Sequence, residues 1–188
     1  MTSAQLISWV VSAITFGTVI MFGCIGEAIN QKAGNLNLGV PGIMQLGGIG
    51  ALTGAFIYES STATPNGVIG MLCALLCAIL ASALGSLIYS FLTVTLKANQ
   101  NVTGLTLTIF GTGIANFFGG SLMKLSGGVG SISVATTANV FKLRLPFISG
   151  KLGLFGSLFL NYGWMAYFCL VLAFMANYFA MTPSFFDG

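Results

Sequence analysis

The chain has 188 residues, of which 56% are hydrophobic and 5% are charged, with a net charge of +3 and a mean hydropathy of +0.97. A soluble domain devotes about a quarter of its residues to charge, so this composition excludes a water-soluble globular protein and indicates one embedded in membrane lipid. The thinly spread positive charge also excludes a nucleic-acid partner, because binding to phosphates requires clustered Lys and Arg.

Residues suited to catalysis or metal binding are scarce. The chain has no histidine and three acidic residues, which leaves little for acid–base chemistry. All four cysteines lie in apolar stretches: Cys24, Cys73, Cys77 and Cys169. Because nothing completes a tetrahedral zinc site around Cys73 and Cys77, we interpret the four as small apolar packing residues. The sequence predicts a protein that is not an enzyme and has no cofactor.

Windows without charge locate the membrane spans, because a charge at the bilayer centre costs about 2.5–3.5 kcal/mol on insertion scales. Five windows hold the roughly 20 residues that a crossing needs. They predict spans over residues 6–25, 38–58, 68–96, 102–118 and 162–181. We expect an all-α fold, a polytopic transmembrane helical bundle with Gly- and Pro-interrupted helices, in a single domain over residues 1–188.

The first span, 6–25, has an alternative interpretation as a cleaved signal sequence. Signal sequences begin with positive charge, and residues 1–5 contain no basic side chain. We therefore expect a membrane helix.

Residues 33–43, A-G-N-L-N-L-G-V-P-G-I, break the helical pattern at the start of the second span. Pro41 would cost about 3 kcal/mol inside a helix. Two interpretations stay open. In one, Asn37 caps an ordinary helix whose first turn contains Pro41. In the other, the helix is discontinuous, and its freed backbone groups line a polar cavity together with Asn35 and Asn37.

The third span carries small residues at every fourth position: Gly70, Ala74, Ala78, Ser82, Ser86 and Ser90. The second span contains the pair Gly50 and Gly54. Helices in lipid associate through close backbone approach at small residues. These patterns predict a packed bundle, with the alternative that small residues are simply common in membrane helices.

Residues 98–116, A-N-Q-N-V-T-G-L-T-L-T-I-F-G-T-G-I-A-N, are unusually polar for a span. At 100° per residue, Asn99, Thr103 and Thr106 share one face. A second face holds Asn101, Thr108, Thr112 and Asn116. Neutral donors and acceptors suit a solute rich in hydroxyl or amide groups better than an ion. The alternative is hydrogen bonding between helices, worth about 0.6 kcal/mol per contact.

Lys and Arg in short loops set the orientation. Lys32 and Lys97 lie in the first and third connections, and the second has neither. We therefore expect those two connections in the cytoplasm and the N-terminus outside. The long connection 119–161 then lies outside. Its Gly-, Ser- and Thr-rich part 125–141 is predicted to be a loop, and 152–160 a dipping segment.

Two of these segments resemble a known family. G-E-A-I-N-Q-K-A-G-N-L-N-L-G-V-P-G-I-M, at 26–44, and N-Q-N-V-T-G-L-T-L-T-I-F-G-T-G, at 99–113, closely resemble permease subunits of ABC importers for nucleosides and simple sugars. These belong to the ribose and branched-chain amino acid permease family. The resemblance implies a pore in a bacterial cell membrane, formed with a second permease subunit. It also implies a cytoplasmic ATPase subunit and an extracytoplasmic substrate-binding lipoprotein as partners.

The residues that we predict to contact solute are neutral and polar: Asn35, Asn37, Asn99, Asn101, Thr103, Thr108, Thr112 and Asn116. Family members continue beyond the last span with a basic segment that docks on the ATPase, whereas this chain reads T-P-S-F-F-D-G at 182–188. We therefore expect a truncated product or fragment. The alternatives to a coupled permease are a remnant that transports nothing and a passive membrane facilitator.

Overall fold

The computed structural model describes residues 3–127, 132–142 and 162–181. Residues 1–33 with 141–188 and residues 34–140 form two compact units, which are described separately below. The predicted dipping segment 152–160 and the sequence at 182–188 lie outside the described residues.

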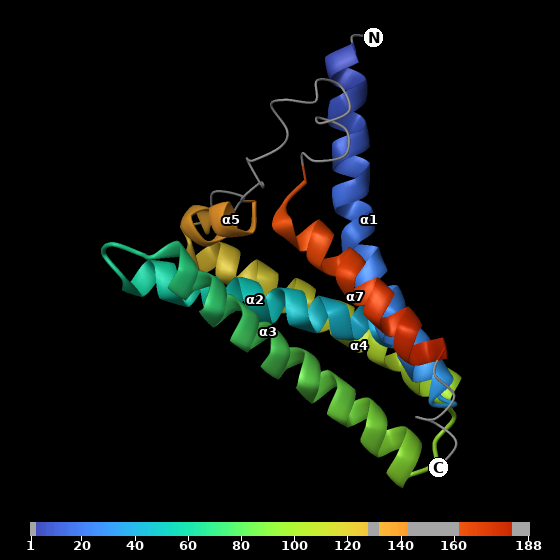
Figure 1. Ribbon diagram of the computed structural model, residues 1–188. Coiled ribbons are helices and arrows are strands. Elements are labelled where there is room, and N and C mark those ends of the chain that lie inside the picture. The colour runs from blue at the N-terminus through green and yellow to red at the C-terminus, as the bar shows by residue number, and fades with distance from the viewer. Residues whose placement is uncertain (1–2, 128–131, 143–161, 182–188) are drawn as a thin grey trace. The chain divides into compact units, whose positions relative to one another are not determined.

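Every element of the described residues is a helix (Figure 1), in the order α1 (Ser3–Lys32), α2 (Val40–Ser61), α3 (Gly67–Ser90), η1 (Phe91–Thr95), α4 (Gln100–Leu125), α5 (Ala135–Phe141) and α7 (Trp164–Met181). Four stretches are long and apolar enough to cross a membrane: α1, α2, α3 with η1, and α4. The apolar helix α7 is shorter. The predicted all-α, polytopic membrane fold is confirmed.

Side-chain caps and glycines set the helix boundaries. The Asn66 side chain accepts a hydrogen bond from the Val68 amide at the start of α3, and Asn99 accepts two at the start of α4. Past the ends of α1 and α4, Gly34 and Gly127 take positive φ angles of 82° and 95°. This left-handed conformation ends helices and is open to glycine without steric cost.

Two boundaries differ from the sequence prediction. The prediction ended the first and fourth spans at 25 and 118, whereas α1 continues to Lys32 and α4 to Leu125. Both extensions carry a lysine in the last turn, where a cation is favourable beside the helix carbonyls. The charge-free windows end before Glu27 in the first span and before Lys124 in the fourth, although both helices continue past these residues.

The connection between α3 and α4 is tightly wound. The end of α3 passes into the π-helix η1, in which the Leu96 amide bonds the Phe91 carbonyl. Lys97 then adopts a φ of +52°, a left-handed conformation that costs a residue with a Cβ about 1–2 kcal/mol. The chain therefore reverses within four residues between η1 and α4.

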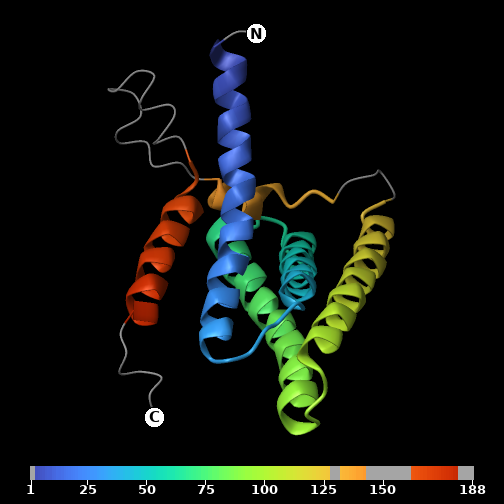
Figure 2. The ribbon, with the colours of Figure 1, turned by 90° about the vertical axis from the view of Figure 1, so that its right-hand side faces the viewer.

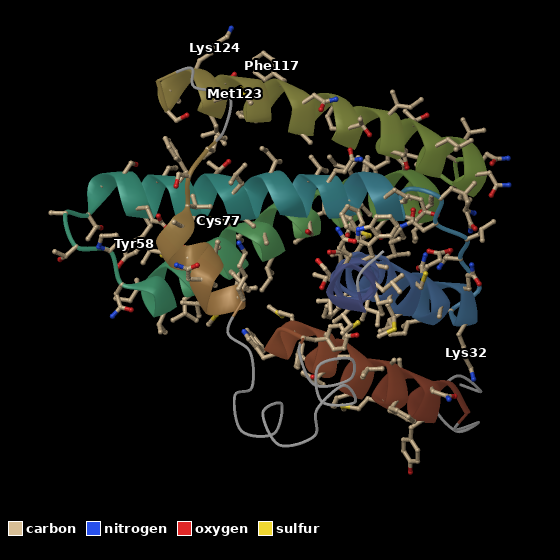
Figure 3. All side chains as sticks on the ribbon, turned by 90° about the horizontal axis from the view of Figure 1, so that it is seen from above. Lys32, Tyr58, Cys77, Phe117, Met123 and Lys124 are labelled. Carbon is tan, nitrogen blue, oxygen red and sulfur yellow. The ribbon has the colours of Figure 1, made fainter. Side chains whose placement is uncertain are left out.

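In the unit 34–140, α2 lies between α3 and α4 (Figures 1 and 2). Glycines of α2 form the contact with α3. A Cβ at Gly50 would lie 2.7 Å from the Ala81 Cβ and 2.8 Å from the Cys77 carbonyl oxygen, and one at Gly54 would lie 2.7 Å from the Cys77 sulfur. Figure 3 labels Cys77 at this contact. Cys77 therefore acts in packing, as the sequence predicts.

The small-residue stripe of α3 is only partly used at this contact. Gly70 and Ala74 are buried, and Ala78 and Ser82 approach Gly47 of α2. Ser86 and Ser90 are exposed. The first part of the stripe therefore lies in a packed face of α3 and its last part on an exposed face. The change of face follows because residues four apart are not quite in line on a helix of 3.6 residues per turn.

In the other unit, α1 and α7 pack side by side. The buried Cys169 sulfur lies 3.7 Å from the Thr18 carbonyl oxygen, and the rings of Phe22 and Phe168 are 6.4 Å apart. A free, buried cysteine at this contact fits the predicted packing role.

The glycine contact between α2 and α3 gives the first testable prediction. Gly50→Ala forces a methyl group against Ala81 and the Cys77 backbone, which should destabilise the fold by about 1–3 kcal/mol. Gly48→Ala is the matched control in the same helix, because beyond its own turn of helix backbone no atom lies within 4 Å of the added methyl group. Thermal unfolding of the detergent-purified protein measures both. Equal melting temperatures for the two variants would contradict the packing described.

Candidate functional site

The connection at residues 34–39, between α1 and α2, lies directly against the first half of α4. A Cβ at Gly104 of α4 would lie 2.8 Å from the Leu38 amide nitrogen and 2.9 Å from that of Gly39. Glycine at 104 therefore lets the backbone of the connection touch the backbone of a helix.

The close approach continues along α2 and α4. A Cβ at Gly42 would overlap the Leu107 carbonyl oxygen and lie 2.6 Å from the Thr108 Cα, and one at Gly111 would overlap the Gly42 carbonyl. Gly42, Gly104 and Gly111 are all buried. Three glycines on two helices thus set the position of α4 relative to the connection.

Side chains of α3 and α4 hold the connection in place. The Tyr89 hydroxyl donates to the Leu36 carbonyl at 2.9 Å, and the Thr108 hydroxyl donates to the Leu38 carbonyl at 2.8 Å. Gln100 accepts from the Leu36 amide at 3.0 Å and donates to the Asn35 side-chain oxygen at 2.9 Å. We call Tyr89, Gln100 and Thr108 the clamp.

Asn37 completes the arrangement from within the connection. Its side-chain oxygen accepts the Gly39 amide at 2.8 Å, and the residue is 9% exposed. Four backbone groups of the connection, the Leu36 and Gly39 amides and the Leu36 and Leu38 carbonyls, are thus bonded to side chains. Non-helical backbone is tolerated in a membrane protein where the protein itself supplies such partners.

The two interpretations of Pro41 can now be compared. Pro41 lies in the first turn of α2, which is continuous to Ser61 and has Gly39 as its N-cap. The helix is therefore not discontinuous at Pro41. The expected cap is also different, since Asn37 bonds the amide of the capping glycine itself.

The structure separates the eight predicted solute contacts into three groups. Asn35, Asn37 and Thr108 bond within or across the connection. Thr103 is 8% exposed, and the half-buried Thr112 donates to the Thr108 carbonyl of its own helix. The exposed group contains Asn99, Asn101 and Asn116.

Within the exposed group, Asn99 caps α4 by accepting the Asn101 and Val102 amides. The side chains of Asn101 and Asn116 make no hydrogen bond to the residues that the structure describes. These two asparagines retain their full capacity to bond something outside this unit. Solute contact by any of the eight remains a prediction.

Gln100 and Tyr89 are site residues that the sequence does not predict. Gln100 lies between two of the predicted asparagines, and its two bonds reach residues 64 and 65 positions away. Tyr89 is 6% exposed within an apolar span. A buried tyrosine hydroxyl needs a partner, so a lone tyrosine in such a span was a usable signal.

An open cavity of about 190 Å³ lies between α3 and α4, lined by Ile88, Tyr89, Leu92, Thr103, Thr106, Leu107 and Phe110. Its accessible surface is apolar, and the Thr106 hydroxyl is bonded to the Val102 carbonyl. The cavity therefore offers no hydrogen-bonding wall for a sugar.

The chemistry at this site is that of neutral amides and hydroxyls. Among the described residues, no three His, Cys, Asp or Glu side chains come together as a metal site would require. The clamp contains no ionisable carboxyl, amine or imidazole group. Such side chains can bind and orient a neutral polar molecule through hydrogen bonds.

Comparison with known proteins gives one informative match. Over 120 residues the chain is 33% identical to a Haloferax volcanii protein named "Putative glucose ABC transporter permease protein TsgC13". The matched region covers 61% of this chain and 32% of that protein. The chain thus spans about a third of the length of this relative. No protein-family model and no solved structure matches the chain.

The clamp gives the second prediction. Gln100→Ala removes two hydrogen bonds, each worth about 0.5–1.5 kcal/mol, so the fold should lose about 1–3 kcal/mol of stability. Gln100→Glu keeps the acceptor and loses the donor, so its effect should be smaller. Thermal unfolding and hydrogen exchange at the Leu36 amide measure these effects.

Gln45→Ala is the control for this prediction. Gln45 is exposed on α2, and its side chain makes no hydrogen bond to the described residues. Its removal should leave the melting temperature and the Leu36 exchange rate unchanged. If Gln100→Ala also leaves both unchanged, Gln100 does not hold the connection.

Proposed function

We propose that this chain is part of the permease subunit of an ABC importer and forms a section of the membrane path for a sugar or a nucleoside. The observation that carries the proposal is the 33% identity, over 120 residues, to a protein named as a glucose ABC transporter permease. The resemblance of the segments 26–44 and 99–113 to nucleoside and sugar permeases supports it. A transport role agrees with a chain that is membrane-embedded and rich in neutral polar groups.

The side-chain amides of Asn101 and Asn116 give α4 an exposed polar surface. An asparagine side chain facing hydrocarbon is expensive, so the exposed Asn101 and Asn116 favour polar surroundings. A neutral amide both donates and accepts, which suits the hydroxyl groups of a sugar and the base edges of a nucleoside. We assign these two residues to the wall of the path.

The clamp has a supporting role in this proposal. The Leu36 and Leu38 carbonyls and the Leu36 and Gly39 amides are bonded to protein side chains. These backbone groups are not available as solute ligands. The clamp instead fixes α4 at the connection, so that the asparagines keep a constant position during passage of solute.

The finer parts of the proposal follow from the family resemblance. The chain functions in the cell membrane with a second permease subunit, a cytoplasmic ATPase subunit and an extracytoplasmic binding lipoprotein. Hydrolysis of ATP takes place in the ATPase, and this chain supplies the path.

Uptake measurements test the proposed function. Cells that produce the chain should take up radiolabelled glucose or a radiolabelled nucleoside, and deletion of its gene should abolish one of these activities. Uptake into right-side-out vesicles should require ATP inside the vesicle, on the cytoplasmic face. Equal uptake with and without the gene would refute the proposal, and uptake without ATP would indicate a passive facilitator.

The third prediction concerns the wall of the path. The double variant Asn101→Ala with Asn116→Ala should lower uptake about tenfold, which corresponds to about 1.4 kcal/mol of lost interaction. Its amount in the membrane should not change, since neither side chain bonds within the described structure. Ile109→Ala, at a position 75% exposed on the same helix, is the control. Wild-type uptake by the double variant would exclude the assignment.

A further inference from the structure

A short helix closes one end of the α2–α3 hairpin. Figure 1 shows α5 beside this end, and Figure 3 shows Tyr58 there, near α5. The sequence predicted a loop over 125–141, so this helix was not expected. Its contacts reach from residue 59 of α2 to residue 70 of α3, at the end of the hairpin that joins these helices.

Two glycines form a seat for α5 on α3. A Cβ at Gly67 would lie 2.6 Å from a Val140 methyl carbon and 2.9 Å from the Thr136 carbonyl oxygen. A Cβ at Gly70 would lie 3.4 Å from the Thr137 Cβ and would overlap the Thr137 hydroxyl. The seat accepts α5 because neither position carries a side chain.

A carboxylate fastens α5 to the hairpin. The Thr137 amide, in the first turn of α5, donates to the Glu59 carboxylate at 2.7 Å. The first amides of a helix have no partner within the helix, and an anion satisfies them well. Hydrogen bonds to ionised groups are also stronger than those between neutral groups. Glu59 thus acts as a latch.

Other features of α5 weaken its attachment. A helix of seven residues is too short to be stable alone. Thr137 is 3% exposed, and its buried hydroxyl makes no hydrogen bond to the residues that the structure describes. Burying a hydroxyl in this way costs free energy. Few large apolar side chains in A-T-T-A-N-V-F compensate, so α5 is an element of low local stability.

We propose that α5 is a releasable lid over the end of the α2–α3 hairpin, seated on Gly67 and Gly70 and latched by Glu59. Its release uncovers the seat and opens this end of the α2–α3 hairpin to solute. The lid role depends on the proposed transport function, whereas the latch depends only on the contacts above. Glu59 is a positioning residue, because it acts through α5.

Hydrogen exchange of the whole chain in lipid nanodiscs tests the latch. Glu59→Ala should speed exchange of the amides in 135–141 about tenfold, because the latch is lost. Glu59→Gln keeps an acceptor oxygen and should preserve most of the protection. Thr137→Val removes the buried hydroxyl at nearly constant shape, so it should slow this exchange about threefold or more.

These results separate the latch from the transport function. Unchanged exchange in Glu59→Ala, or unchanged or faster exchange in Thr137→Val, would overturn the latch. In uptake assays, Thr137→Val should transport at least about twofold more slowly than wild type, because a lid that opens less often admits less solute. Slowed exchange with normal uptake would overturn the lid role. Absence of wild-type uptake would refute the proposed function while the exchange result stands.

Discussion

Backbone amides and carbonyls that leave a helix lose their partners within it and need others. This constraint explains the most connected part of the structure. At residues 34–39 the chain leaves one helix and enters the next, and Tyr89, Gln100 and Thr108 bond the backbone or side chains that this passage frees. Their position depends in turn on α2, which holds α3 and α4 on its two sides.

The hydrogen bonds to the connection also require that the backbone of α4 lies close to the backbones of the connection and of α2. Hydrogen bonds between a helix side chain and a neighbouring connection are short only if no Cβ intervenes. Gly104 meets that requirement against Leu38 and Gly39, and Gly111 meets it against Gly42. Because apolar burial provides little force between helices in lipid, packing at glycine and hydrogen bonding act together. Loss of the close packing would therefore weaken the hydrogen bonds, and loss of the hydrogen bonds would weaken the packing.

The sequence was informative about what depends on local composition. Charge-free windows located the long helices, and the run from Asn99 to Asn116 identified α4 as the polar helix. Gly50 and Gly54 were correctly associated with helix packing. Each of these signals is contained in one segment, and each follows from the physics of lipid as solvent.

Long-range partners were beyond such reasoning. Nothing in the segment around Gln100 indicates that its amide reaches Asn35 and Leu36, since that depends on which connection lies beside α4. The helix α5 was missed for the same reason. Its Gly-, Ser- and Thr-rich surroundings favour a loop, and the carboxylate that meets its first turn comes from Glu59, 78 residues before Thr137.

The left-handed backbone at Lys97 has a consequence for how the protein enters the membrane. Glycine would adopt this φ of +52° without steric cost, so the turn itself does not call for a lysine. A lysine there carries a positive charge, and positive charge in a short connection favours the cytoplasmic side during insertion. Replacing Lys97 with glycine would therefore relax the turn and at the same time remove that charge. At this corner a single residue carries both the backbone strain of the turn and a charge that biases insertion.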